Sequence, residues 1–310
     1  MLLDHRVRSG FLLAAGAALL YGANQPASAV LINGPLGPRY MVESRLVALA
    51  VGFGAVACVR HRNQLRLTPR EAVTLAGFGL AGLAVMQWAL TEAIARIAVG
   101  IVVVCVYCGA FLVAIWCRIV RREPTPPSVW VAITIGIGGL VLAVGVGGAT
   151  ARSLTGAGLA FAALAACAFA YYALHADILL RRRPAAVVLG AGALVAATAW
   201  CVFAAPVARF PLSAIRHRDV TLGAVALPAW VVLAASLTLG TVLPYLMVLA
   251  SIARIGPTPT SVAGMIEPVV AVLLSWVWLA QQLTVLQVLG GVVVIGSVVL
   301  VQHGRSRALA

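Results

Sequence analysis

The tetrapeptide Ile-Ala-Arg-Ile occurs twice in this chain, as Ile94-Ala95-Arg96-Ile97 and, 158 residues later, as Ile252-Ala253-Arg254-Ile255. The same offset aligns three further pairs, which are Glu123 with Gln281, Gly138 with Gly296 and Leu142 with Leu300. Recurrence at one fixed offset is the mark of an internal structural repeat. The sequence therefore predicts a chain built as two halves of similar structure.

Both halves are too apolar for an ordinary soluble domain. Of the 310 residues, 63% are hydrophobic and only 10% are charged, and the mean hydropathy is +1.06. Soluble domains carry roughly 25% charged residues, so most of this surface must face lipid. The net charge of +14 lies in short clusters between long apolar runs, and we therefore expect no nucleic-acid partner.

The apolar runs have the length of transmembrane helices, which need about 20 residues to cross the bilayer core. Ten such stretches can be placed, at about 10–32, 40–59, 72–91, 97–117, 128–148, 156–179, 185–206, 227–250, 257–279 and 285–302. We predict an all-α integral membrane protein of about ten transmembrane helices. Its first five-helix repeat spans 10–148, its second spans 156–302, and 303–310 form a cytoplasmic tail.

The first span has an alternative interpretation as a cleavable secretory signal. Arg6 and Arg8 would form its basic region, the run from Phe11 to Leu20 its apolar core, and Ala27-Ser28-Ala29 the cleavage site. Cleavage would leave nine predicted helices and break the internal repeat. We therefore expect this segment to remain as a transmembrane helix.

The arginines predict the orientation in the membrane. Fifteen of the 22 basic residues fall on the side of the N-terminus and six on the other side, with Arg45 inside the second span. Because basic residues concentrate on the cytoplasmic side, both termini should be cytoplasmic in a multi-pass protein of the cell membrane. Five is an odd number, so the second half must enter the membrane from the opposite side and form an inverted repeat.

Several stretches resemble one transporter family. The segment from Ala253 to Val301, with Gly256, Glu267-Pro268 and Gly290-Gly291, is similar to the end of a repeat in the drug/metabolite transporter superfamily, EamA type. The first half resembles that family at Tyr21-Gly22-Ala23-Asn24, Arg45, Arg122-Glu123 and Trp130. The stretch from Ile94 to Val120 looks most similar to the threonine/homoserine exporter branch. The resemblance implies alternating inward-facing and outward-facing states and the efflux of small metabolites such as amino acids.

Polar side chains within the spans predict a central cavity, because exposing them to lipid is costly. They concentrate in spans 1, 3, 6, 8 and 9, which together with span 4 should surround the cavity. In span 8, Thr238, Thr241 and Tyr245 are expected on one face. The candidate substrate or coupling residues are Asn24, Gln25, Arg45, Gln87, Thr91, Tyr171, His175, Thr241, Tyr245 and Glu267.

Glu267 is the strongest of these candidates because it is a carboxylate near the middle of a span, where insertion costs roughly 2.5 kcal/mol or more. It can exchange protons to couple transport, or it can neutralise a substrate ammonium group. The alternative is a protonated side chain that only holds helices together through hydrogen bonds. Arg45 is also open to two interpretations, as an interfacial partner of Glu43 or as a group that attracts a substrate carboxylate.

Three prolines predict breaks in transmembrane helices, at Pro26, Pro244 and Pro268. Proline lacks an N–H group and frees a carbonyl one turn earlier, and transporters place substrate sites beside such broken helices. Each proline can also be a tolerated kink.

A transporter is the function class that these features favour. The chain has neither H-E-x-x-H nor G-x-S-x-G and no pair of intramembrane carboxylates, so we expect no enzyme, no catalytic residues, no metal site and no cofactor. The expected partners are a small-molecule substrate, protons and membrane lipids, and the expected state is a monomer or a homodimer. Multidrug efflux, a passive facilitator, a lipid-carrier flippase and, outside this class, an integral membrane enzyme remain alternatives.

The arginine distribution leads to a topology prediction. A reporter enzyme that works only in the cytoplasm should be active when it is fused after Arg307. A reporter that works only outside the cytoplasm should be active when it is inserted near Arg216. Activity measured for paired cytoplasmic and periplasmic reporters checks this. The reverse pattern would contradict the predicted orientation.

Overall fold

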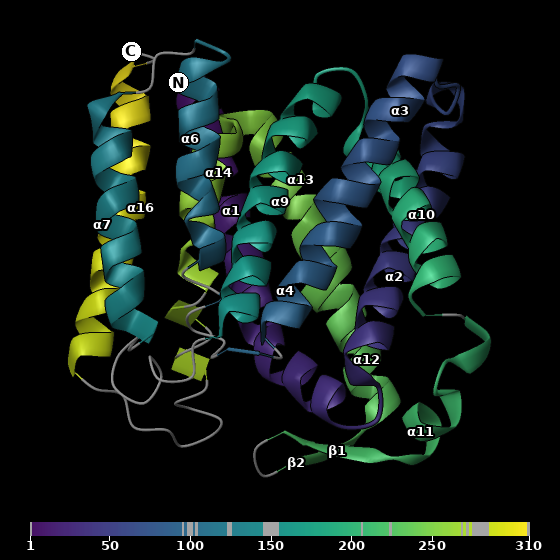
Figure 1. The fold of residues 1–310 in the computed structure, drawn as a ribbon. Helices are drawn as coiled ribbons and strands as arrows, with labels where there is room; N and C mark the ends of the chain where they lie inside the picture. The colour runs from purple at the N-terminus through teal and green to yellow at the C-terminus, as the bar shows by residue number, and fades with distance from the viewer. Residues whose placement is uncertain are drawn as a thin grey trace.

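The computed structural model is almost entirely helical, which confirms the predicted all-α class (Figure 1). It describes residues 2–94, 96–97, 102, 105–122, 126–144, 155–205, 207–222, 225–267, 269–270, 273–274 and 285–308. Within these residues, five helical segments have the length and apolar composition to cross a membrane: Gly37–Arg60, Pro69–Ala93, Gly156–Leu180, Ala185–Phe203 and Ala229–Ile255.

The helices follow the predicted spans in order. In the first half they are α1 (Leu2–Asn33), α2 (Gly37–Arg60), α3 (Pro69–Gly77), the π-helix η2 (Phe78–Val85), α4 (Met86–Ile94), α6 (Gly109–Ile119) and α7 (Pro127–Val144). In the second half they are α9 (Gly156–Leu180), α10 (Ala185–Phe203), α12 (Ala229–Leu237), the π-helix η4 (Thr238–Val242), α13 (Leu243–Ile255), α14 (Pro257–Gly264) and α16 (Val285–Ala308). The last helix continues into the segment 303–310 that we predict as a cytoplasmic tail.

The two π-helices occupy matching places in the two halves. Adding 158 to the bounds of η2 gives residues 236–243, and η4 lies within that range. Single π-turns are uncommon and concentrate at functional sites. Their recurrence at the repeat offset is structural support for the internal repeat.

The halves are inverted relative to each other, because their matching helices pack antiparallel. At one end of the α2–α10 pair, Trp200 Nε1 donates to the carbonyl oxygen of Arg39 over 3.1 Å. Further along the same pair, a Cβ atom added at Gly190 would lie 2.9 Å from the backbone nitrogen of Gly54. The α7–α16 pair is also antiparallel: Gly136 faces Ser297 and Gly139 faces Gly290.

One side-chain contact joins residues that are equivalent in the repeat. Gln87 Nε2 donates to the hydroxyl of Tyr245 over 3.3 Å, and the two residues are separated by 158 residues, the offset at which η2 and η4 match. A residue can touch its own equivalent only close to the symmetry axis. The pseudo-two-fold axis therefore passes near this contact, between the halves.

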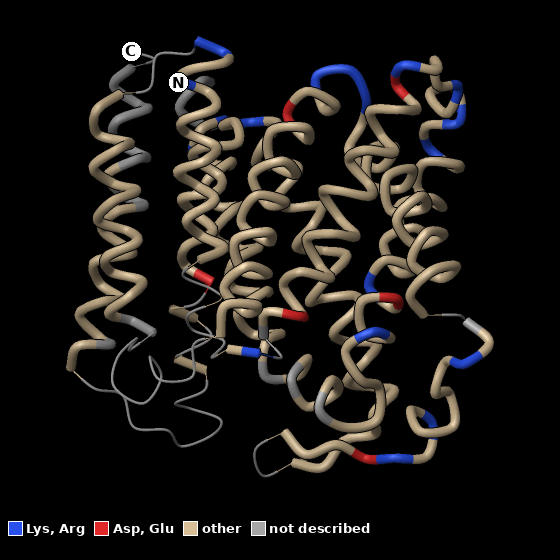
Figure 2. The backbone as a smooth tube through the Cα atoms, in the orientation of Figure 1, with Lys and Arg blue, Asp and Glu red and all other residues tan. Residues whose placement is uncertain are grey.

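Both chain termini lie at one end of the molecule, which we call the termini end (Figure 1). The opposite end, the hairpin end, carries the short helix α11 (Leu212–His217) and an antiparallel hairpin of β1 (Asp219–Leu222) and β2 (Val225–Pro228). Figure 2 shows basic residues in the loops of the termini end and in the segment beside the hairpin.

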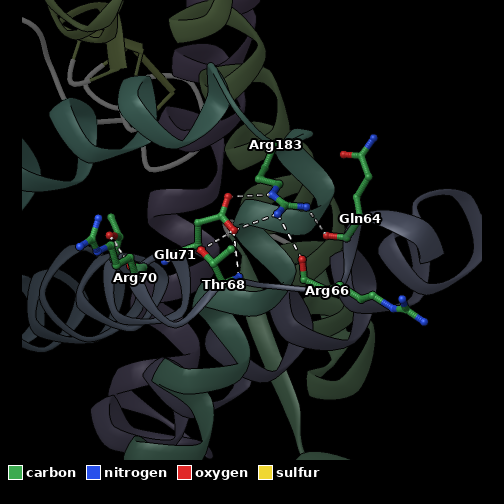
Figure 3. A network of polar contacts seen from close by, with 7 residues as sticks. Gln64, Arg66, Thr68, Arg70, Glu71 and Arg183 are labelled. Atoms are coloured by element: carbon green, nitrogen blue, oxygen red, sulfur yellow. Dashed lines mark hydrogen bonds and ion pairs between the residues drawn. The ribbon is translucent and has the colours of Figure 1, made fainter.

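At the termini end, one ion-pair network joins a loop of each half (Figure 3). Thr68 caps α3 in a capping box with Glu71. Arg183, from the turn between α9 and α10, donates from Nη2 to Glu71 Oε2 over 2.9 Å and from Nε to Glu71 Oε1 over 3.2 Å. Its Nη1 also donates to the carbonyl oxygen of Gln64 over 2.8 Å. A two-point contact with a carboxylate fixes orientation as well as distance, so this network holds the two loops in register.

A second ion pair at the termini end joins α6 to α9. Arg121 pairs with the carboxylate of Asp177 and donates from Nη2 to the carbonyl oxygen of Leu174 over 2.9 Å. Asp177 is buried and also accepts a hydrogen bond from Arg181 over 3.3 Å. The ends of α6 and α9 are thus held together on this side.

The closest approach between helices predicts a stability effect. A Cβ atom added at Gly79 would overlap the carbonyl oxygen of Gly192, whereas one added at Gly138 would have no atom within 4 Å. We expect Gly79→Ala to force η2 and α10 apart and to destabilise the protein by about 1–3 kcal/mol. Thermal unfolding in detergent measures the effect, and Gly138→Ala serves as the control, which should unfold at the temperature of the parent or slightly above it because alanine favours a helix more than glycine does. Equal unfolding temperatures for all three proteins would contradict this packing.

Candidate functional site

A cavity of about 150 Å³ lies between the two halves, close to the Gln87–Tyr245 contact. Its polar wall is formed by Asn24, Gln25, Arg45, Gln87, Thr241 and Glu267. Its aromatic wall is formed by Tyr21, Tyr107, Phe169, Tyr172 and Tyr245. The lining comes from spans 1, 3, 4, 6, 8 and 9, as the polar residues predicted, and in addition from α2 through Arg45.

Glu267 is held by one donor on each carboxylate oxygen. Gln25 Nε2 donates to Oε1 and the hydroxyl of Tyr107 donates to Oε2, each over 2.8 Å. The donors come from α1 and from the segment just before α6, while Glu267 follows α14. The carboxylate therefore joins three separate spans, and both of its oxygens face groups that can donate to a negative charge.

Arg45 faces the same cavity and keeps an N–H group that forms no hydrogen bond within the described part of the protein. Its Nη2 donates to the hydroxyl of Ser28 over 2.7 Å, and its Nε is buried without a hydrogen-bond partner. Among the described residues, Arg45 has no ion pair with Glu43. Glu43 is instead buried against Cys201, so the interpretation of these two residues as an interfacial ion pair is wrong. An unpaired buried guanidinium N–H is costly unless another group completes it.

Tyr245 stands at the centre of the aromatic wall. The rings of Tyr21 and Tyr172 each pack against it edge-on, with centroids 5.9 Å away and planes at 86°. Its hydroxyl accepts the hydrogen bond from Gln87. Tyr172 also stacks on Phe78 of η2, so the wall is continuous with the interior packing of the first half.

The carbonyl oxygen that Pro244 leaves free accepts a hydrogen bond from another helix. Proline has no N–H to offer the carbonyl oxygen of Gly240, four residues earlier, and this oxygen accepts a hydrogen bond from Asn24 Nδ2 over 3.2 Å. The irregular segment η4 ends just before Pro244. Pro244 thus follows a π-helical irregularity within the continuous helical segment Ala229–Ile255, and α1 likewise continues as a helix through Pro26, so neither proline ends its helix. Pro268 lies outside the described residues.

Three candidates predicted from the sequence lie away from the cavity. Tyr171 points its hydroxyl toward Gly77 and stacks on His175, with ring centroids 3.7 Å apart. His175 Nδ1 lies 3.0 Å from the carbonyl oxygen of Tyr171. Thr91 donates to the carbonyl oxygen of Gln87 within its own helix. The cavity-facing stripe of α9 passes through Phe169 and Tyr172 instead.

The predicted stripe of span 8 is wrong at one position. Thr241 and Tyr245 line the cavity, but Thr238 is exposed on the outer surface and donates to the carbonyl oxygen of Ala234. The reason is the π-helix η4, whose extra residue per turn rotates Thr238 away from the face that an α-helix would give it.

Tyr107 and Tyr172 are site residues that the sequence interpretation missed. Tyr107 is an isolated hydroxyl in a long apolar stretch, a signal that marks a polar contact within a membrane. Tyr172 neighbours Tyr171, and only the rotation of α9 decides which of the two faces inward.

The arrangement suits the binding of small molecules. It offers a carboxylate, a guanidinium, three amides and several aromatic rings around one space. Within the described part of the chain, no three His, Cys, Asp or Glu side chains gather as metal ligands would. The site can thus bind charged groups and apolar surface together.

An inverted repeat of helices with a polar cavity between its halves is the architecture of many secondary transporters. The profile of the EamA-like transporter family matches residues 8–145 and again residues 156–302. The chain belongs to this family of drug/metabolite transporters, and it is a multi-pass membrane protein and not an enzyme. The search of curated proteins finds no match to it.

Solved structures support the fold over the whole chain. One crystal structure, described only as that of a protein, superposes with a TM-score of 0.73. It covers 98% of this chain and 99% of its own, at 15% sequence identity. In total, 28 chains of solved structures match. At this level of identity the similarity establishes the shared fold alone.

The cavity predicts which positions water can reach. In a variant without native cysteines, Thr241→Cys should react with a charged, water-soluble thiol reagent, because Thr241 lines the cavity. Thr238→Cys, from the same π-helix, is the matched control and should react slowly, because Thr238 is exposed on the outside of a spanning segment, where we expect lipid to cover it. Labelling rates measured in native membranes test this. Equal labelling rates would show that the two positions share one environment and would contradict the orientation of η4, which places Thr241 in the cavity and Thr238 on the outside.

Proposed function

We propose that this transporter exports small zwitterionic or cationic metabolites, foremost amino acids, and that Glu267 couples the export to proton entry. The observation that carries the proposal is the presence of one carboxylate and one guanidinium in the same aromatic-walled cavity. The termini end would face the cytoplasm, following the predicted excess of arginines there. The resemblance to the threonine/homoserine exporter branch favours the same class of substrate.

The charges of the cavity complement those of an amino acid. Glu267 can accept hydrogen bonds from a substrate ammonium group, and Arg45 can donate from its unpartnered Nε to a substrate carboxylate. Tyr21, Tyr172 and Tyr245 can offer ring faces to the cation. A substrate that carries both charges would satisfy groups that the empty cavity leaves incomplete.

Proton coupling follows from competition for the same carboxylate. A carboxylate within a membrane protein is costly unless a proton or a cation neutralises it. If a substrate ammonium group and a proton occupy Glu267 in turn, release of the substrate outside allows a proton to bind to Glu267 there. The transporter then returns to its inward-facing state with this proton and releases it inside. The alternating states would arise from rocking of the two inverted halves about the axis near Gln87 and Tyr245.

Arg45 favours amino-acid export over multidrug efflux. A buried guanidinium repels lipophilic cations, which are typical substrates of multidrug efflux, but attracts a carboxylate. A passive facilitator would need no titratable group beside the substrate. The position of Glu267, with donors on both oxygens, therefore favours a coupled carrier.

Glu267→Gln provides the test of coupling. Glutamine keeps the shape and most of the hydrogen bonding but cannot ionise. Loss of one charge-assisted contact of about 1.5–3 kcal/mol predicts a fall of about tenfold or more in gradient-driven efflux. Glu267→Asp should fall less. Efflux of labelled amino acids from everted vesicles, with and without a pH gradient, is the measurement.

The matched control is Glu92→Gln, which removes a carboxylate that pairs with Arg96 at a helix end outside the cavity. It should transport like the parent. Elution of each purified variant as a single species establishes that it has inserted and folded. Full gradient-driven transport by Glu267→Gln would show that the carboxylate is only a structural hydrogen-bonding group.

A further inference from the structure

A second, smaller cavity of about 70 Å³ adjoins the first. The two cavities share the walls formed by Tyr21, Tyr107, Phe169, Tyr172, Val248 and Glu267. The smaller one extends from there toward the termini end, past residues of α1 that precede Tyr21. Glu267 therefore stands at the junction between a polar chamber and a side chamber.

The side chamber is narrow because its far walls are made of small residues. Ala14, Ala17 and Ala18 come from α1 and Ala173 from α9, and each is at most 2% exposed. Ile252 of α13 contributes the larger apolar group among the far walls. Any larger side chain in place of these alanines would take up the space directly.

The hydroxyl groups of Thr260 and Ser261, on the far walls of the side chamber, are already engaged and offer little to a ligand. Thr260 donates to the carbonyl oxygen of Gly256 over 2.8 Å and lies 2.9 Å from the hydroxyl of Ser251. Ser261 donates to the carbonyl oxygen of Pro257 over 2.9 Å. Apart from Glu267 and the tyrosines on the wall that it shares with the larger cavity, among them Tyr172, whose hydroxyl has no hydrogen-bond partner among the described residues, the side chamber thus presents mainly methyl and methylene groups.

We propose that this side chamber receives the aliphatic side chain of an α-amino acid substrate and sets the upper limit on its size. The inference rests on the proposed function, which places the substrate ammonium at Glu267 and its carboxylate toward Arg45. The side chain of an α-amino acid starts one carbon from the ammonium nitrogen. A substrate held at Glu267 therefore directs its side chain into the adjoining apolar space.

The volume of the chamber defines the substrate class. A dry, apolar cavity of about 150 Å³ in another protein holds one benzene molecule, so a chamber of about half that volume suits a side chain of a few carbons. Branched aliphatic groups fit this description, whereas an indole ring does not. The structure thus points to small aliphatic amino acids as the preferred substrates.

The experiment compares Ala173→Val with Ala176→Val, two buried positions of the same helix α9. Only Ala173 lines the side chamber. Each purified protein is reconstituted in liposomes, and the exchange of labelled alanine, valine, leucine and tryptophan is measured. In the parent, valine and leucine should exchange faster than tryptophan.

Ala173→Val should reduce the exchange of valine and leucine relative to alanine by about tenfold or more, the effect of crowding an apolar pocket by one or two methyl groups. Ala176→Val should leave the order of substrates unchanged. Ile252→Val enlarges the chamber without adding strain and should shift the preference toward leucine. It keeps the proposal testable if Ala173→Val does not fold.

The two proposals fail in different ways. If the parent exchanges amino acids, but neither Ala173→Val nor Ile252→Val changes the order of preference, the role proposed for the side chamber is wrong and the proposed function stands. The absence of any amino-acid exchange by a well-folded parent overturns both. A change of order in the Ala173 and Ile252 variants, but not in Ala176→Val, supports the side chamber.

Discussion

Close contact between glycine-bearing helices of opposite halves is the constraint on which the rest of this structure depends. Apolar helices in lipid gain little from the hydrophobic effect, so their association depends on van der Waals packing that small residues permit. A Cβ atom at Gly79 would overlap the carbonyl oxygen of Gly192, and one at Gly190 would lie 2.9 Å from the backbone nitrogen of Gly54, so neither Gly79 nor Gly190 leaves room for a side chain. These contacts bring η2 and α2 against α10. In doing so they place Arg45 of α2 beside a space that α1, α4, α9 and α13 enclose.

Polar contacts complete the arrangement where helices are irregular. Each of them satisfies a group that lipid cannot. Asn24 occupies the carbonyl oxygen that Pro244 leaves free, and Gln25 with Tyr107 occupies both oxygens of Glu267. Because these donors come from other spans, the hydrogen bonds that satisfy the carbonyl oxygen of Gly240 and the carboxylate of Glu267 also hold neighbouring spans together around the cavity. The packing of the helices and the geometry of the site therefore depend on the same contacts.

The sequence predicted what depends on composition and period, namely the spans, the repeat and a cavity that contains Asn24, Gln25, Gln87, Thr241, Tyr245 and Glu267. It could not predict the rotation of individual helices. The hydrogen-bond pattern of η4 turns Thr238 outward, and the choice between Tyr171 and Tyr172 depends on how α9 packs against η2. Tyr107 joins the site through a contact with Glu267 across 160 residues, which no local pattern can reveal.

The repeat is symmetric in its scaffold but not in its charges. The position equivalent to Glu267 is Gly109, where a Cβ atom would lie 2.8 Å from the carbonyl oxygen of Ala166, so no carboxylate could fit there. Each half therefore contributes one charge, a guanidinium from the first and a carboxylate from the second. A motion of one half against the other changes the separation of these two charges directly. Such a motion would therefore change the affinity for a zwitterion when the cavity changes the side to which it opens. A site built from one half alone would keep the same geometry throughout the cycle.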